Sequence, residues 1–104
     1  MVVEISIMPL GTGLHMHELI APIVDEIHAS GLPYELHSMG TNVQGEWDEV
    51  MPLVKRCMDG LYARGVERVS VSLHLSDRRD APNTLAHRRE SVRPATAPRS
   101  PSAG

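Results

Sequence analysis

The order in which apolar residues change their spacing along the chain is the feature that most constrains its fold. Residues 68–76 alternate strictly, with Val69, Val71 and Leu73 on one face and mainly serines on the other. Such alternation is typical of a β-strand with one buried face. The same pattern over shorter stretches predicts three further strands, at residues 3–8, 34–39 and 41–45.

Between these stretches, two segments carry apolar residues at helical spacing. The spacing predicts one helix around residues 16–27 and another around residues 50–61, each with one apolar stripe facing a core. Gly31 and Gly65 follow as helix-ending residues. Pro22 lies inside the first helix, where proline costs about 3 kcal/mol. The stripe stays regular on both sides of it, and we therefore retain this helix.

The resulting order is strand, helix, strand, strand, helix, strand. It predicts an α+β, ferredoxin-like βαββαβ sandwich, which is a four-stranded antiparallel sheet with two helices on one face. Residues 9–13, Pro-Leu-Gly-Thr-Gly, are expected to end the first strand and form a loop. The uncovered face of the sheet then presents Glu4, Ser6, Ser70, Ser72 and His74. This face either meets water or packs against the sheet of a second subunit.

The 104 residues divide into one domain, residues 1–92, and a tail, residues 93–104. The tail is rich in proline, alanine and serine, and we expect it to be disordered. Residues 83–92 are expected to form a short closing helix. A domain of this size buries only about 60% of its unfolded surface. Self-association into a homodimer or homotetramer is one remedy, and we expect it here.

Charge and cysteine content exclude several classes of protein. Residues 1–76 carry a net charge of −6 and residues 77–104 carry +3. A nucleic-acid groove needs a basic surface, whereas an acidic body is compatible with a cationic small ligand. Cys57 is the only cysteine, which excludes an internal disulfide and a cysteine zinc cluster. No signal peptide or membrane-spanning run is recognisable, so we expect a cytoplasmic protein without membrane contact.

The segment from Met39 to Val50 holds a dense set of polar groups. Thr41 and Gln44 offer a hydroxyl and a carboxamide, close to three acidic residues and to Trp47, the only tryptophan. These groups suit a small-molecule site. They suit equally an ordinary strand-to-helix junction, because acidic residues favour a helix N-terminus. Local chemistry alone leaves both interpretations open.

The six histidines show no recognisable zinc spacing. His15 and His17 lie two residues apart, so they can share a metal on a strand or loop but not on a helix. The run Gly11-Thr12-Gly13 precedes a helix whose amides could hold an anion, but it lacks the lysine of a phosphate loop. No nucleophile or acid–base pair is apparent, and no metal, cofactor or catalysis is expected.

Five segments, in this order and spacing, together resemble the thiamine-binding protein family, also known as the YkoF-like proteins. They are residues 5–13, 31–41, 45–50, 76–80 and 90–92. The resemblance implies a ferredoxin-like fold, homo-oligomers built through the sheets, and binding of thiamine or its hydroxymethylpyrimidine part. The ligand-side residues that it implies are Ser6, Pro9, Gly11, Thr12, Thr41, Gln44, Glu46 and Trp47.

Our first hypothesis is therefore a non-catalytic binder of thiamine or hydroxymethylpyrimidine in thiamine homeostasis. In this hypothesis Thr41 and Gln44 bond the ring edge, Glu46 offsets positive charge, and Trp47 stacks on or walls the site. The alternative is a structural or regulatory homo-oligomeric module with a drifted pocket. Its motive is Gln44, since the family usually has glutamate there and a carboxamide carries no charge. A small enzyme, supported only by unpaired histidines, is the third class.

Overall fold

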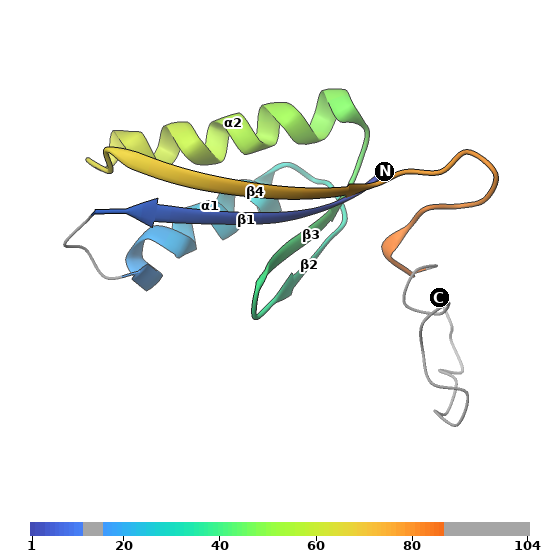
Figure 1. The fold of residues 1–104 in the computed structure, drawn as a ribbon, viewed down its shortest axis with the longest axis horizontal. Helices are drawn as coiled ribbons and strands as arrows, with labels where there is room; N and C mark the ends of the chain where they lie inside the picture. The colour runs from blue at the N-terminus through green and yellow to red at the C-terminus, as the bar shows by residue number, and fades with distance from the viewer. Residues whose placement is uncertain (12–15, 87–104) are drawn as a thin grey trace.

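The structure is a computed structural model that describes residues 1–11 and 16–86. Its elements are β1 (Val2–Leu10), α1 (Met16–Ala29), β2 (Tyr34–His37), β3 (Gly40–Gln44), α2 (Trp47–Ala63) and β4 (Arg68–Ser76) (Figure 1). This order confirms the predicted βαββαβ sequence of elements. The tail and most of the predicted closing helix lie outside the described residues.

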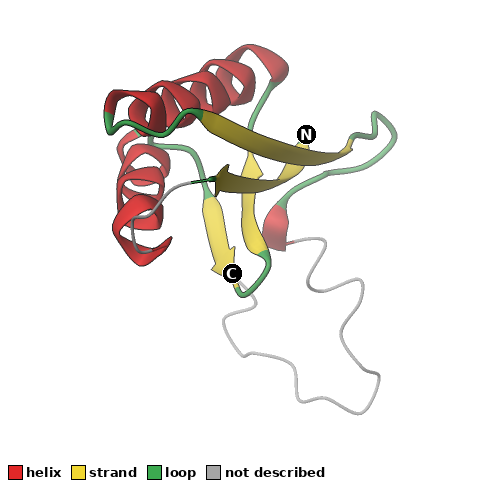
Figure 2. Cartoon of the chain, turned by 60° about the vertical axis from the view of Figure 1, so that its left-hand side comes forward, coloured by secondary structure: helices red, strands yellow, loops and turns green. Residues whose placement is uncertain are grey.

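The four strands form one antiparallel sheet in the order β2-β3-β1-β4. Both helices lie on the same side of this sheet, and the β2–β3 hairpin is steeply inclined to the β1–β4 ribbon (Figure 2). The α+β, ferredoxin-like arrangement is thus confirmed. β4 pairs with β1 along its whole length, but β3 pairs with it only from Val2 to Ile5. Among the described strands, residues 6–10 of β1 therefore have a neighbour on one side only.

The predicted loop at residues 9–13 is wrong at its beginning, because β1 continues through Pro9 and Leu10. Pro9 is buried and lies opposite Val69 in the register with β4. Proline lacks an amide donor and occurs in strands with an unpaired edge, which is the situation of β1 beyond the reach of β3. Gly11, with φ of 65°, then turns the chain away from the sheet.

The hairpin turn lies earlier in the chain than the sequence indicated, and it has two residues instead of one. β2 ends at His37, two residues before the predicted end, and β3 begins at Gly40. A Cβ at Gly40 would lie 2.5 Å from the carbonyl oxygen of Ile5, so only glycine lets the hairpin approach β1 this closely. The two-residue turn, Ser38 and Met39, is exposed.

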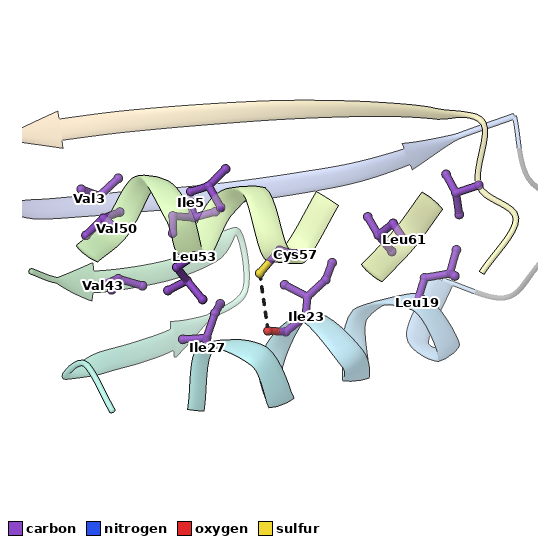
Figure 3. Close-up of a cluster of buried hydrophobic side chains, with 12 residues drawn as sticks. Val3, Ile5, Leu19, Ile23, Ile27, Val43, Val50, Leu53, Cys57 and Leu61 are labelled. Carbon is purple, nitrogen blue, oxygen red and sulfur yellow. Dashed lines mark hydrogen bonds between the residues drawn. The ribbon is translucent and has the colours of Figure 1, made fainter. Parts of the chain in front are cut away.

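The core lies between the sheet and the two helices (Figure 3). Side chains that are at least nine-tenths buried come from each layer: Val3, Ile5 and Val43 from the sheet, Leu19, Ile23 and Ile27 from α1, and Val50, Leu53, Val54, Cys57 and Leu61 from α2. The predicted apolar stripes supply most of these residues, although Ile20 of α1 is 41% exposed and the buried Leu53 of α2 was not expected in the stripe. α1 continues through Pro22, as predicted. Cys57 is a core residue, as predicted.

The helix-free face of the sheet, which we call the open face, carries the predicted residues. The register places Glu4 opposite His74 and Ser6 opposite Ser72. Met8, with 47% of its surface exposed, continues the same row of β1 toward its end. The open face is therefore a strip of small and polar side chains with an apolar end.

Candidate functional site

An apolar cavity of about 210 Å³ opens between α1 and the β2–β3 hairpin, and we call it the hairpin cavity. Residues 5–8 of β1 form its floor, Ile20, Ile23, Val24 and Ile27 of α1 form one wall, and residues 36–41 form the other. The cavity exists because β1 and β4 extend past the end of β3. The helix thus covers a stretch of β1 that, of the four described strands, only β4 pairs with.

Thr41 is the most informative polar group of the hairpin cavity. Its residue is only 6% exposed and lines the cavity. Among the described residues, the one fully buried side-chain oxygen or nitrogen without a hydrogen-bond partner is Oδ1 of Asn83, not the hydroxyl of Thr41. The hydroxyl of a threonine that lines a largely apolar cavity can donate and accept a hydrogen bond at the polar edge of a ligand.

The floor of the cavity adds backbone groups. Residues 6–8 of β1 line the cavity, and none of the strands that the structure describes pairs with them on the hairpin side. Their backbone N–H and C=O groups on that side need partners. A flat heterocycle with donors and acceptors along its edge can supply them in the way that an added strand does.

The mouth of the cavity is formed by the hairpin turn, which His37 holds. The Nδ1 atom of His37 accepts a hydrogen bond from the backbone amide of Met39 at 3.2 Å. On the open face, Nε2 of the same ring lies 3.1 Å from Oδ1 of Asn42 and 3.6 Å from a carboxylate oxygen of Glu4. His37 therefore connects the turn to the two inner strands of the sheet.

A second, polar cavity of about 440 Å³ lies at the other end of β3, where the chain enters α2, and we call it the junction cavity. Gln44, Glu46, Glu49 and Asp77 are among its lining residues. The carboxamide oxygen of Gln44 accepts a hydrogen bond from the backbone amide of Leu85 at 3.1 Å. Gln44 thus ties the segment after β4 to the sheet.

The structure separates the ligand-side residues expected from the sequence. Ser6 and Thr41 line the hairpin cavity, and Gln44 and Glu46 line the junction cavity. Trp47 is 58% exposed and lines neither of them.

The remaining expected residues lie outside both cavities or outside the description. Pro9 is buried in β1, Gly11 is exposed beyond it, and Thr12 lies outside the described residues. His37 and the apolar wall of α1 were not expected at a site. The only sequence signal for the wall is Ile20 and Val24, which widen the apolar stripe beyond the fully buried positions.

The described part of the chain also bears on two functional classes, metal-binding proteins and membrane-spanning proteins. Within residues 1–11 and 16–86, no group of three or more histidine, cysteine, aspartate or glutamate side chains is placed to hold a metal. His15 lies outside these residues, and the side chain of His17 is not described. None of the described helices is long and apolar enough to cross a membrane.

A largely apolar cavity with a few polar groups is the kind of site in which proteins commonly bind small molecules. Residues 3–93 match the sequence model of the family described as "Thiamine-binding protein", and the chain belongs to this family.

Two relatives show how far the similarity extends. A UPF0045 protein of Synechocystis is 33% identical over 91 residues, which are 88% of this chain and 75% of that protein. A UPF0045 protein of Methanothermobacter thermautotrophicus is 34% identical over 92 residues, which cover 86% of this chain and 93% of that one.

Solved structures share the fold. A hypothetical protein of Methanocaldococcus jannaschii superposes with a TM-score of 0.80 at 28% identity, covering 88% of this chain and 93% of that one. A protein of Thermotoga maritima, described as a proposed thiamine biosynthesis or salvage protein, superposes with a TM-score of 0.74 at 26% identity. The match covers 88% of this chain and 97% of that one.

Proposed function

We propose that this protein is a non-catalytic binder of thiamine or of its hydroxymethylpyrimidine part, and that the pyrimidine ring enters the hairpin cavity. The observation that carries the proposal is the largely apolar hairpin cavity lined by Thr41, a polar residue that is only 6% exposed. Family membership and the description of the Thermotoga maritima protein support thiamine chemistry.

The cavity suits the pyrimidine part better than the whole vitamin. Its volume of about 210 Å³ is below the usual range for drug-sized ligands, which begins near 300 Å³. An aminopyrimidine is flat, with two apolar faces and a polar edge. In our proposal the faces pack against Ile23 and Ile27 of α1, and the edge meets Thr41 and the backbone of β1. The thiazolium of thiamine then lies toward the exposed hairpin turn.

Calorimetric titration with hydroxymethylpyrimidine and with thiamine tests the proposal. Native protein is expected to bind both. Thr41→Val keeps the shape of the side chain and removes its hydroxyl, so binding of both ligands is expected to weaken by about threefold to tenfold, the worth of one hydrogen bond. Absence of heat at millimolar ligand contradicts the proposed function.

A matched variant distinguishes the two cavities. Glu46→Gln removes a charge from the junction cavity and leaves the hairpin cavity untouched, so binding is expected to stay within a factor of two. If Glu46→Gln weakens binding and Thr41→Val does not, the ligand belongs to the junction cavity.

The alternative function is a structural or regulatory homo-oligomeric module whose pocket has drifted. The observation that suggested this alternative was Gln44 at a position where the family usually has glutamate. In the structure the side-chain oxygen of Gln44 accepts the amide of Leu85, and a glutamate carboxylate can accept the same bond. Gln44→Glu discriminates the two functions: if this variant gains thiamine binding that the native chain lacks, the alternative is correct.

A further inference from the structure

The hydrogen bonds of His37 point to a pH-sensitive latch at the mouth of the hairpin cavity. We propose that the neutral imidazole of His37 holds the β2–β3 turn in its cavity-forming position, and that protonation of the ring releases the turn. The expected effect on ligand affinity rests on the proposed function, whereas the expected effect on the Met39 amide does not.

The contacts assign the tautomer of His37. A backbone amide only donates, so Nδ1, which lies 3.2 Å from the amide nitrogen of Met39, must present its lone pair. In a neutral ring the other nitrogen then carries the proton. Nε2–H donates to Oδ1 of Asn42 at 3.1 Å and faces the carboxylate of Glu4 at 3.6 Å. The structure thus assigns the neutral, Nε2-protonated form.

A second proton can only go to Nδ1, where the Met39 amide already points. Two N–H groups then face each other, and the hydrogen bond from Met39 is lost. The charged ring gains an ion pair with Glu4, but the side chain of Glu4 is 47% exposed, and exposed pairs contribute little. Protonation therefore favours rotation of the imidazole ring toward Glu4. The backbone amide of Met39 in the hairpin turn then lacks its hydrogen-bond acceptor.

The turn is the part of the cavity lining with the fewest other restraints. Gly40 is held against the backbone of Ile5, and Leu36 and His37 belong to a paired strand. Ser38 and Met39 lie between them, and Met39 is 76% exposed. All of these turn residues line the hairpin cavity. Loss of the bond to His37 therefore acts on the mouth of the cavity and leaves its floor in place.

Other titratable groups of the open face must be separated from His37. Glu4 of β1 faces the ring, and Glu35 of β2 precedes His37 by two residues on the same face. His74 of β4 lies opposite Glu4 in the sheet. Asn42, the contact from β3, does not titrate. A histidine normally changes charge between about pH 5 and 8, so His74 is the group that most needs its own control.

The experiment follows the Met39 amide by ¹⁵N NMR in the ligand-free protein between pH 8 and pH 5.5. In the native chain, the hydrogen-exchange protection of this amide is expected to fall by about threefold to tenfold as His37 protonates, after correction for intrinsic exchange. His37→Asn supplies a side-chain oxygen that can accept the amide two residues on and does not titrate, so its protection stays constant. His74→Asn is the matched control, and it keeps the native pH dependence.

The ligand readout uses hydroxymethylpyrimidine over the same pH range. Both proteins share any effect of ligand titration on affinity, so the difference between them reports on His37. The affinity of the native protein is expected to fall by about threefold to tenfold more than the affinity of His37→Asn. His37→Ser, whose hydroxyl can accept the same amide more weakly, serves if His37→Asn does not fold. Equal pH dependence of Met39 protection in native protein and in His37→Asn overturns the latch. If no ligand binds at all, the proposed function fails, and the amide measurement still decides the latch.

Discussion

At the scale of single residues, Gly40 shows how one position shapes the cavity. Its missing side chain lets β3 approach the backbone of Ile5, where a Cβ would meet the carbonyl oxygen at 2.5 Å and the carbonyl carbon at 3.3 Å. Both are backbone atoms of a paired strand, so they cannot move aside as the end of a flexible side chain can. The hairpin and the turn held by His37 depend on this close approach.

Gly40→Ala is therefore expected to lower the free energy of unfolding by about 1–3 kcal/mol. Gly60→Ala is the control, because Gly60 lies inside α2, where the nearest atom to an added Cβ is the guanidinium of Arg64 at 3.7 Å. Alanine is the better helix former by about 1 kcal/mol, so this variant should gain stability. Urea denaturation measures both. A Gly40→Ala variant as stable as the native protein would show that the hairpin can move away from β1.

At the scale of elements, the contact between the two helices contains the single thiol. Cys57 of α2 is 3% exposed, and its sulfur lies 4.0 Å from the carbonyl oxygen of Ile23 in α1 (Figure 3). Burial, with a smaller contribution from Glu26, raises the pKa of the Cys57 thiol to about 11. The thiol therefore stays neutral in the folded protein at physiological pH.

This raised pKa predicts a loss of stability in alkali. An unfolded cysteine ionises with a pKa of about 8.5, so the unfolded chain releases its proton first. The contribution of the thiol is complete below about pH 8.5 and is lost as the pH rises through the folded pKa of about 11. Between pH 8.5 and 11, the native protein should lose more stability than Cys57→Ala, as measured by urea denaturation. Parallel pH curves of the two proteins would contradict this expectation.

At the scale of the whole molecule, the open face is the side of the sheet that neither helix covers (Figure 2). The register places Ser6, Ser70 and Ser72 on this side, together with Met8. Small side chains let a second sheet approach to about 10 Å. We predict that the protein forms a homodimer or homotetramer through this face, with an isologous contact.

Ser72→Arg tests this assembly, because it places a long charge in the middle of the open face. A buried unpaired charge costs several kcal/mol, so the variant is expected to sediment as a monomer of 11.4 kDa at micromolar concentration. Ala63→Arg, at the exposed end of α2, is the matched control and should keep the native assembly. A monomeric native chain refutes the prediction. An oligomer that survives Ser72→Arg places the contact elsewhere, for example at the edge of β2 or β4.

The sequence by itself determined the kind and order of the elements and the composition of the two sheet faces. The reason is that the periods of strands and helices are local: a strict alternation such as Val69-Ser70-Val71-Ser72 has the same meaning wherever the strand lies. The buried stripes of both helices and the core position of Cys57 follow from the same patterns. Family resemblance added the expectation of a thiamine-related ligand.

Only the tertiary structure decided how far each strand runs and which polar residues meet. Pro9 lies in a strand because β4 is long enough to pair with it while β3 is not. The same difference in length creates the hairpin cavity. Thr41 and Gln44 are three residues apart on β3, yet they line different cavities. Pairing partners and strand lengths arise from contacts between residues far apart in the chain, and no local pattern records them.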